Sequence, residues 1–290
     1  MPFLAVPDVL ALPAAPPDFC VSYGDDPAQF AELRLPAGDG PHPVAVVVHG
    51  GCWLGEYDLG TTRAVADALR RAGCATWHVE YRRLGMAGGG WPGTFADVGA
   101  GIDALRPAAC DHRLDLGRVV AIGHSAGGHL AMWAAARHRV PRDSDVWMPD
   151  PLEIAGVVSL AGIVDLRAFL DIQESSCGGP VITRLLGGSP SDVPGRWRAA
   201  SPAEMLPLGV RQVLITGADD QVVPPSIGAG YTRAARALGD PVEEVVVPDA
   251  AHFEVVAPGS VAWPAVKRAV LQLANTRSRP ASVLPASALR

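Results

Sequence analysis

The stretch that decides the fold is RVVAIGHSAGGHL, residues 118–130. Its first six residues form an apolar, β-branched run typical of a buried strand, and the residues after Ser125 have the composition of a helix. Two glycines, Gly123 and Gly127, flank the serine. Ser125 is either the ordinary cap of that helix or a nucleophile lifted out of a sharp turn. The glycines favour the nucleophile, because a sharp strand-to-helix turn has no room for side chains beside the serine, whereas a cap needs neither glycine.

Apolar runs alternate with amphipathic segments along most of the chain. Strands are predicted at 44–48, 75–81, 118–123, 154–162, 211–217 and 242–248, and helices at 62–73, 95–106, 126–138, 227–239 and 260–275. This order predicts parallel strands covered by helices on both faces. The predicted fold class is therefore α/β, with a mostly parallel, doubly wound sheet. Residues 19–23 and 30–36 are expected to add an antiparallel hairpin at one edge.

One long connection interrupts the alternation. Residues 165–207 join two predicted core strands and contain CGGP, GGSPSDVPG and SPAEMLP. A connection of this length is unusual unless it carries function, so we expect a short cap or lid over the carboxyl ends of the strands. Residues 1–275 are expected to form a single domain, and residues 276–290 a flexible tail.

The composition describes a globular chain of 290 residues with a formal net charge of −6. Hydrophobic residues make up 49% and charged residues 19%, which provides a large core and excludes general disorder. Nucleic-acid binding depends on clustered Lys and Arg, so the charge argues against that partner. The start of the chain lacks the basic segment of a signal peptide, and no apolar run approaches the roughly 20 residues of a membrane helix. We expect a cytoplasmic protein with a small-molecule partner and neither a nucleic acid nor a membrane.

The cysteines and the lysine restrict the chemistry further. A lysine nucleophile or Schiff base is possible only at Lys267, the single lysine of the chain. The five cysteines are widely spaced and include no C-x-x-C pair, so we expect free thiols in a reducing compartment and neither a disulfide framework nor a zinc site. They are Cys20, Cys52, Cys74, Cys110 and Cys177.

Candidate catalytic residues follow the strands, where parallel sheets bind their ligands. A serine hydroxyl needs a base within hydrogen-bond reach and a carboxylate that orients this base. The serine elbow occurs in a fold with the chain order Ser, acid, His, and His252 is the only histidine after residue 138. The acid is expected at Asp219 or Asp220, after the strand at 211–217, with Asp165 as a further alternative.

The developing oxyanion of such a reaction needs hydrogen-bond donors. Ala126 supplies one N–H group directly after the serine. The loop HGGCW, residues 49–53, corresponds to an HGGG-type motif after the strand at 44–48, and it predicts the N–H groups of Gly51 and Cys52 as the others. The alternative is that HGG is only a turn after a strand.

Together these residues make the chain resemble an α/β-hydrolase of the esterase group over roughly residues 40–275. The segment D-Q-V-V-P, which begins at Asp220, resembles the acid turn of many such enzymes and favours Asp220 over Asp219. HGGCW fits the HGGxW pattern of kynurenine formamidases (arylformamidases), and GHSAGGHL and His252-Phe253-Glu254 are similar to segments of that group. HGGxW also occurs in related bacterial esterases.

This resemblance implies acyl transfer by Ser125, His252 and Asp220 without a metal or an organic cofactor. The kynurenine formamidase family cleaves N-formylkynurenine, which makes a formamidase the first hypothesis and a general short-chain carboxylesterase the alternative. A remote alternative is a non-catalytic binding protein on a hydrolase scaffold. Three aromatic residues are candidates to line a pocket for the leaving group, although ordinary packing explains each of them equally well: Trp53, Trp91 and Phe253.

Overall fold

Eight strands form one sheet within residues 2–277, the part of the chain that the computed structural model describes. The strands are β1 (Phe19–Ser22), β2 (Phe30–Arg34), β3 (His42–Val48), β4 (Ala75–Val79), β5 (Leu114–His124), β6 (Gly156–Leu160), β7 (Arg211–Gly217) and β8 (Val242–Val247). Their order across the sheet is β1-β2-β4-β3-β5-β6-β7-β8. β2 pairs antiparallel with β1 and β4, and the remaining neighbours are parallel. The predicted α/β class and the hairpin at the sheet edge are confirmed.

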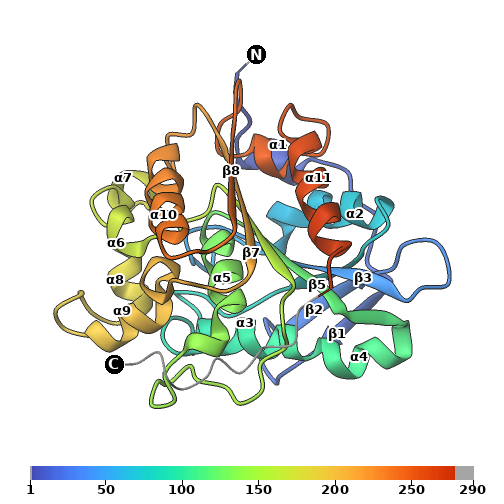
Figure 1. Cartoon of the computed structure of the whole chain (residues 1–290), viewed down its shortest axis with the longest axis horizontal. Helices are drawn as coiled ribbons and strands as arrows, with labels where there is room; N and C mark the ends of the chain where they lie inside the picture. The colour runs from blue at the N-terminus through green and yellow to red at the C-terminus, as the bar shows by residue number, and fades with distance from the viewer. Residues whose placement is uncertain (1, 278–290) are drawn as a thin grey trace.

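Helices cover both faces of the sheet (Figure 1). They are α1 (Val6–Leu10), α2 (Arg63–Arg71), α3 (Gly93–Asp103), α4 (Leu105–His112), α5 (Ala126–Ala135), α10 (Pro225–Ala237) and α11 (Trp263–Ala274), in addition to the cap helices below. α1 and α4 are additions to the predicted helices. Pro107 lies in the first turn of α4, where proline is tolerated.

The central strand β3 shows how the sequence divides the core into two layers. Successive side chains of a strand point to opposite faces. Val44, Val46 and Val48 pack in a cluster with α3 and α5, whereas Ala45 and Val47 pack in a second cluster with α2 and α11. Both sets are apolar because both faces are covered, which explains why the run at 44–48 shows no polar alternation.

The predicted cap at 165–207 consists of short helices rather than a structureless loop. They are α6 (Leu166–Phe169), α7 (Gln173–Cys177), α8 (Val181–Leu186), α9 (Pro194–Ala200) and the 3₁₀ turn at Pro202–Met205. Two side chains of α5 anchor this cap: His129 Nε2 donates to the Ala200 carbonyl at 2.9 Å, and Trp133 Nε1 donates to the Ala199 carbonyl at 3.0 Å. The cap therefore rests on the helix that follows Ser125.

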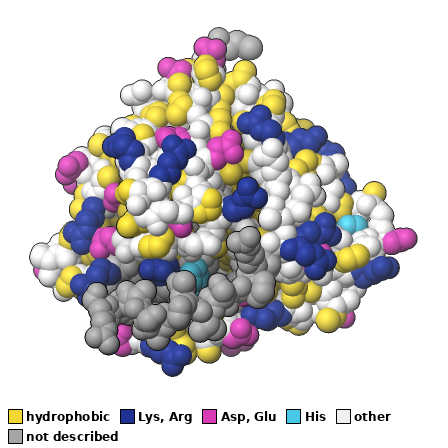
Figure 2. Space-filling view, in the orientation of Figure 1, with side chains coloured by type: hydrophobic (Ala, Val, Ile, Leu, Met, Phe, Trp, Pro, Cys, Tyr) yellow, Lys and Arg dark blue, Asp and Glu magenta, His cyan; other side chains and the backbone are white. Residues whose placement is uncertain are grey.

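Acidic, basic and hydrophobic side chains are interspersed on the face of the molecule drawn in Figure 2. Within residues 2–277, no helix combines the length and the apolar character that a membrane span requires. The predicted flexible tail at 276–290 lies outside the described residues from position 278 onward.

Candidate active site

Ser125 occupies the turn between β5 and α5, with φ 53° and ψ −119°. The residues two positions before and after it, Gly123 and Gly127, must be glycines because backbone atoms pack against them. A Cβ atom at Gly123 would lie 2.0 Å from the Gly127 carbonyl oxygen, and one at Gly127 would lie 2.2 Å from the Val48 carbonyl oxygen. The Ser125 side chain makes no capping hydrogen bond to α5. The turn therefore presents the hydroxyl for another purpose than capping the helix.

His252 and Asp220 lie next to each other although 32 residues separate them. His252 Nδ1 is 2.8 Å from Asp220 Oδ2. The other carboxylate oxygen, Oδ1, accepts hydrogen bonds from the backbone N–H groups of Val222 and Val223, both at 2.8 Å. With Asp220 only 1% exposed and His252 5% exposed, this pair is shielded from water. The backbone N–H groups of its own turn thus orient the Asp220 carboxylate, and the carboxylate orients the His252 imidazole.

The two alternative acids lie elsewhere. Asp219 is exposed on the outside of the same turn. Asp165 caps α6, where its carboxylate accepts from the backbone N–H groups of Arg167 and Ala168 at 3.0 and 3.1 Å. Only Asp220 among the three hydrogen-bonds to His252.

His124 joins the serine turn to the loop of His252. Its Nε2 lies 2.9 Å from the His252 carbonyl oxygen and donates to it, and the two imidazole centroids are 4.6 Å apart. Burial, followed by the charge of a protonated His252, holds the pKa of His124 well below its usual value. His124 is therefore neutral and adds no positive charge beside His252. Phe253 packs its ring 5.1 Å from the His252 ring, so this predicted pocket residue does lie at the site.

The HGGCW loop passes close to the serine. A Cβ atom at Gly50 would lie 2.7 Å from the His124 carbonyl oxygen and 3.1 Å from Ser125 Cβ. The next three residues have positive φ angles, 107° at Gly51, 53° at Cys52 and 56° at Trp53. Within residues 2–277, the backbone N–H groups of Gly51, Cys52 and Ala126 make no hydrogen bond to another protein group. They are free to donate to a ligand.

Two of the predicted pocket residues have packing partners of their own. Trp53 is fully buried, and its Nε1 donates to His129 Nδ1 at 3.2 Å, so its ring packs beneath the loop and presents no surface to a substrate. Trp91 is partly buried; its Nε1 donates to Asp145 Oδ2 at 2.9 Å, and the Arg196 guanidinium lies 5.8 Å from its ring centroid. Packing, the alternative stated for both residues, accounts for Trp53, whereas the pocket role of Trp91 stays a prediction.

A disulfide joins Cys52 of the HGGCW loop to Cys177 of the cap helix α7. The expectation that all five cysteines are free thiols is therefore wrong; Cys20, Cys74 and Cys110 remain free. The spacing gave no signal because 125 residues separate the partners and only the fold brings them together. Disulfides persist in oxidising surroundings, so the expectation of a reducing compartment loses its basis.

A buried polar cluster behind the loop also escaped the sequence analysis. His49 Nε2 lies 3.0 Å from Glu80 Oε1, Arg83 donates to the same carboxylate, and the Tyr81 hydroxyl donates to the His49 carbonyl oxygen at 2.8 Å. Burial, with the Arg83 charge as the smaller cause, lowers the pKa of His49 to about 3. The segment EYRR follows the strand at 75–79 at the carboxyl edge of the sheet, which is the signal that was available. These residues hold the first part of the loop in place.

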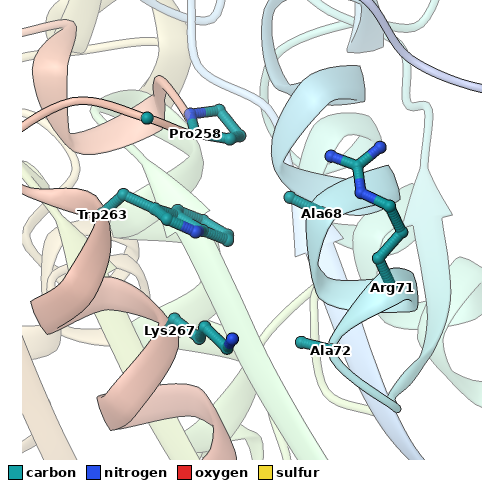
Figure 3. A pocket seen from close by; sticks show the side chains of 7 residues that line it. Ala68, Arg71, Ala72, Pro258, Trp263 and Lys267 are labelled. Atoms are coloured by element: carbon teal, nitrogen blue, oxygen red, sulfur yellow. The ribbon is translucent and has the colours of Figure 1, made fainter.

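A cavity of about 360 Å³ lies between α2 and α11 and contains none of these residues. Figure 3 shows Trp263 and Lys267 on one wall and Ala68 and Ala72 on the other. The single lysine of the chain is therefore not part of the serine site.

The parallel sheet, the serine elbow after β5 and the Asp220–His252 pair on the last two strand ends define an α/β-hydrolase. More particularly, the BD-FAE family model matches residues 32–230, more than half of the chain, and the chain belongs to the BD-FAE family. His252 lies beyond the matched segment. No curated protein matches the chain.

Several solved structures share the fold. One is a truncated carbohydrate esterase from gut microbiota, with a TM-score of 0.74 and 20% identity over 89% of this chain and 95% of that one. Esterase B from Lactobacillus rhamnosis has a TM-score of 0.74 and 19% identity over 91% of this chain and 89% of that one. An esterase from Thermogutta terrifontis has a TM-score of 0.70 and 20% identity over 88% of this chain and 92% of that one. Neither the family model nor these structures reproduces the resemblance to kynurenine formamidases.

Proposed function

We propose that the chain is a serine esterase that hydrolyses small acyl esters through an acyl-enzyme. The observation that carries this proposal is the buried Asp220–His252 pair, with 2.8 Å between Oδ2 and Nδ1, beside a serine in an elbow turn. A carboxylate in this position stabilises the imidazolium that forms when histidine accepts the serine proton. The nitrogen of His252 that remains available for this proton is Nε2.

The reaction proceeds in two halves. Ser125 Oγ attacks the ester carbonyl carbon while His252 Nε2 takes the hydroxyl proton, and His252 then returns the proton to the leaving alcohol. The acyl group remains on Ser125. Water attacks the acyl carbon with His252 again as the base, which releases the carboxylic acid and restores the serine.

Backbone N–H groups stabilise the negative oxygen of both tetrahedral intermediates. Ala126 donates from the first turn of α5, where backbone N–H groups have no helical partner. Gly51 and Cys52 donate from the opposite side, which agrees with the absence of internal partners for all three groups within residues 2–277. Removal of one donor in such a site typically costs about 10²- to 10³-fold in rate.

A small acyl group agrees with the tight surroundings of the serine. Ser125 is only 3% exposed, and the backbone at Gly50 leaves no space for a Cβ atom beside it. The Thermogutta terrifontis esterase is described with bound propionate, and the Lactobacillus rhamnosis enzyme with a phosphonate inhibitor derived from tributyrin. Both of these acyl groups are short, and we propose a short acyl group for the present chain as well. Its partner is then a small-molecule ester.

The formamidase hypothesis rests on the resemblance of HGGCW, GHSAGGHL and His252-Phe253-Glu254 to segments of that family, and it takes second place. The same residues are able to attack a formamide carbon, so a comparison of kcat/KM for an ester and a formamide distinguishes the two hypotheses. We expect higher kcat/KM for p-nitrophenyl acetate than for N-formylkynurenine. A clear preference for N-formylkynurenine would reverse this order.

The serine itself is tested by substitution. We expect Ser125→Ala to lower kcat for p-nitrophenyl acetate by at least about 10³-fold and to abolish labelling by a fluorophosphonate probe, because the nucleophile is lost. Ser226→Ala, at an exposed serine of α10, serves as the matched control and should retain activity and labelling. Absence of labelling in the unmodified chain would instead support a non-catalytic binding protein.

A further inference from the structure

The cap helix α7 is fastened to two loops of the candidate site through adjacent residues. Cys177 forms the disulfide with Cys52 in the HGGCW loop. Ser176 donates its hydroxyl hydrogen bond to the Val222 carbonyl oxygen in the acid turn at 2.8 Å. One five-residue helix therefore connects a loop after β3 with a loop after β7, on opposite sides of the serine strand β5 in the sheet order.

The attachment on the Cys52 side acts on a strained backbone. Non-glycine residues rarely adopt positive φ, and each such residue persists only where its surroundings hold it. Cys52 and Trp53 both have this conformation, and each has a side chain fixed to another element. Trp53 is held by its hydrogen bond to His129 of α5, and Cys52 by its disulfide to α7. The direction of the Cys52 N–H group depends on this backbone conformation.

The attachment on the other side acts on the turn that orients Asp220. The N–H group of Val222 donates to Asp220 Oδ1 at 2.8 Å, while the carbonyl oxygen of the same residue accepts from Ser176. Val222 is thus held between the carboxylate and α7. Movement of α7 would reach both the oxyanion donors and the carboxylate of the site.

We propose that α7 sets the position of the HGGCW loop relative to the acid turn, with Cys177 and Ser176 as positioning residues and the Cys52–Cys177 disulfide as the decisive attachment. The proposal rests on the proposed esterase function. When the disulfide is broken, Cys52 is no longer held in the conformation that points its N–H group at the oxyanion. The lost interaction belongs to the transition state, so kcat falls more than KM changes.

Reduction by a dithiol breaks this attachment in a defined way. One thiolate of the reagent attacks a sulfur of the disulfide, and the other cysteine leaves as a thiolate and takes up a proton. The second thiol of the reagent then closes a cyclic disulfide and releases the remaining cysteine. The protein gains two electrons and two protons, and the dithiol is oxidised.

The test compares Cys177→Ser with the unmodified chain, purified under oxidising conditions, on p-nitrophenyl acetate. Thiol titration of the denatured chain should count three thiols before reduction and five after it, because Cys20, Cys74 and Cys110 are free. We expect kcat of Cys177→Ser to fall about tenfold or more, with KM changed by less than about threefold. Treatment with dithiothreitol, which is removed without air before the assay because its thiolates cleave p-nitrophenyl acetate, should lower the activity of the unmodified chain to the same level and leave Cys177→Ser unaffected. Cys110→Ser, at an exposed free thiol, is the matched control and should behave as the unmodified chain.

Ser176→Ala provides a second variant that leaves the disulfide intact. We expect it to lower kcat by a smaller factor, about two- to fivefold, and to add little in the background of Cys177→Ser because both residues act through α7. If Cys177→Ser does not fold, Ser176→Ala and the dithiothreitol titration of the unmodified chain still decide the question.

Two results would overturn the inference. One is a Cys177→Ser variant with a lower unfolding temperature but unchanged kcat, which would make the disulfide a purely stabilising link. The other is the same activity of the unmodified chain before and after reduction to five thiols. An unmodified, oxidised chain without esterase activity or fluorophosphonate labelling would contradict the proposed function itself, which separates that failure from this one.

Discussion

At the scale of single residues, Asp219 and Asp220 show how position rather than residue type decides a role. The two carboxyl groups are adjacent in sequence, yet one is exposed and the other is 1% exposed and hydrogen-bonded to His252. The turn after β7 causes this difference, because the backbone N–H groups of Val222 and Val223 donate to Asp220. The resemblance to the acid turn of α/β-hydrolases favoured the same residue.

Substitution of each aspartate separates the two roles. We expect Asp220→Asn to lower kcat for p-nitrophenyl acetate by about 10⁴-fold, because an amide no longer stabilises the imidazolium and can hold the histidine in the wrong tautomer. Asp219→Asn is the matched control and should change kcat by less than twofold. Similar losses of kcat in both variants would contradict the assignment of the carboxylate role to Asp220. The measurement is initial rate at saturating substrate for both variants side by side.

At the scale of elements, α5 links the serine turn to the cap. His129 and Trp133 are four residues apart and therefore lie on one face of the helix. Their ring N–H groups reach the Ala200 and Ala199 carbonyls at the end of α9, where helical carbonyls have no internal partner. The sequence predicted a helix at 126–138, but not that two of its side chains hold another element in place.

The hydrogen bond of Trp133 is testable by a conservative change. We expect Trp133→Phe to lower the free energy of unfolding by about 2–4 kcal/mol, because it creates a cavity and leaves the Ala199 carbonyl buried without its partner. Trp147→Phe, at a tryptophan that is 36% exposed, is the matched control and should stay within about 0.5 kcal/mol of the unmodified chain. Urea unfolding followed by circular dichroism measures both. Equal midpoints for the two variants would show that the anchor adds no stability.

At the scale of the whole molecule, the core contains four buried histidines that fold in the neutral form. Burial is the main cause that lowers the pKa of each, to about 3 for His49, to about 4 for His129, and well below the usual value for His78 and His124. The unfolded chain binds a proton at each of these positions below its ordinary pKa of about 6.5, whereas the folded chain does not. Stability is therefore full above that pH and is lost as the pH falls toward the folded values.

We expect the free energy of unfolding to fall between pH 7.5 and pH 5.5 by about 1 kcal/mol for each of these histidines. Urea titrations at the two pH values measure the difference. His129→Gln removes one of the four groups. The decrease in its free energy of unfolding between the two pH values should therefore be about 1 kcal/mol smaller than that of the unmodified chain, whatever the stability of the variant at pH 7.5. His42→Gln, at a partly exposed histidine, is the control and should show the same fall as the unmodified chain. An identical fall in His129→Gln would contradict the assignment.

The sequence by itself determined the order of the strands and of the helices α2, α3, α5, α10 and α11, the place of the long insertion, and Ser125 and His252 as candidate catalytic residues. The physical reason is that these features are local: apolar runs, helical periods and the glycines of a tight turn follow from neighbouring residues. Topology then places the strand ends side by side, so motifs after β3, β5, β7 and β8 meet at one edge.

Only the tertiary structure decided the contacts between segments far apart in the chain. The sequence suggested an aromatic pocket and free thiols, whereas Trp53 packs against His129 beneath the loop and Cys52 is bonded to Cys177 in the cap. Such contacts depend on how α7 and α5 lie against the HGGCW loop, and no local pattern of residues encodes that distance. The HGGCW motif therefore contains the predicted oxyanion donor Cys52, but only the fold shows that this residue is bonded to the cap.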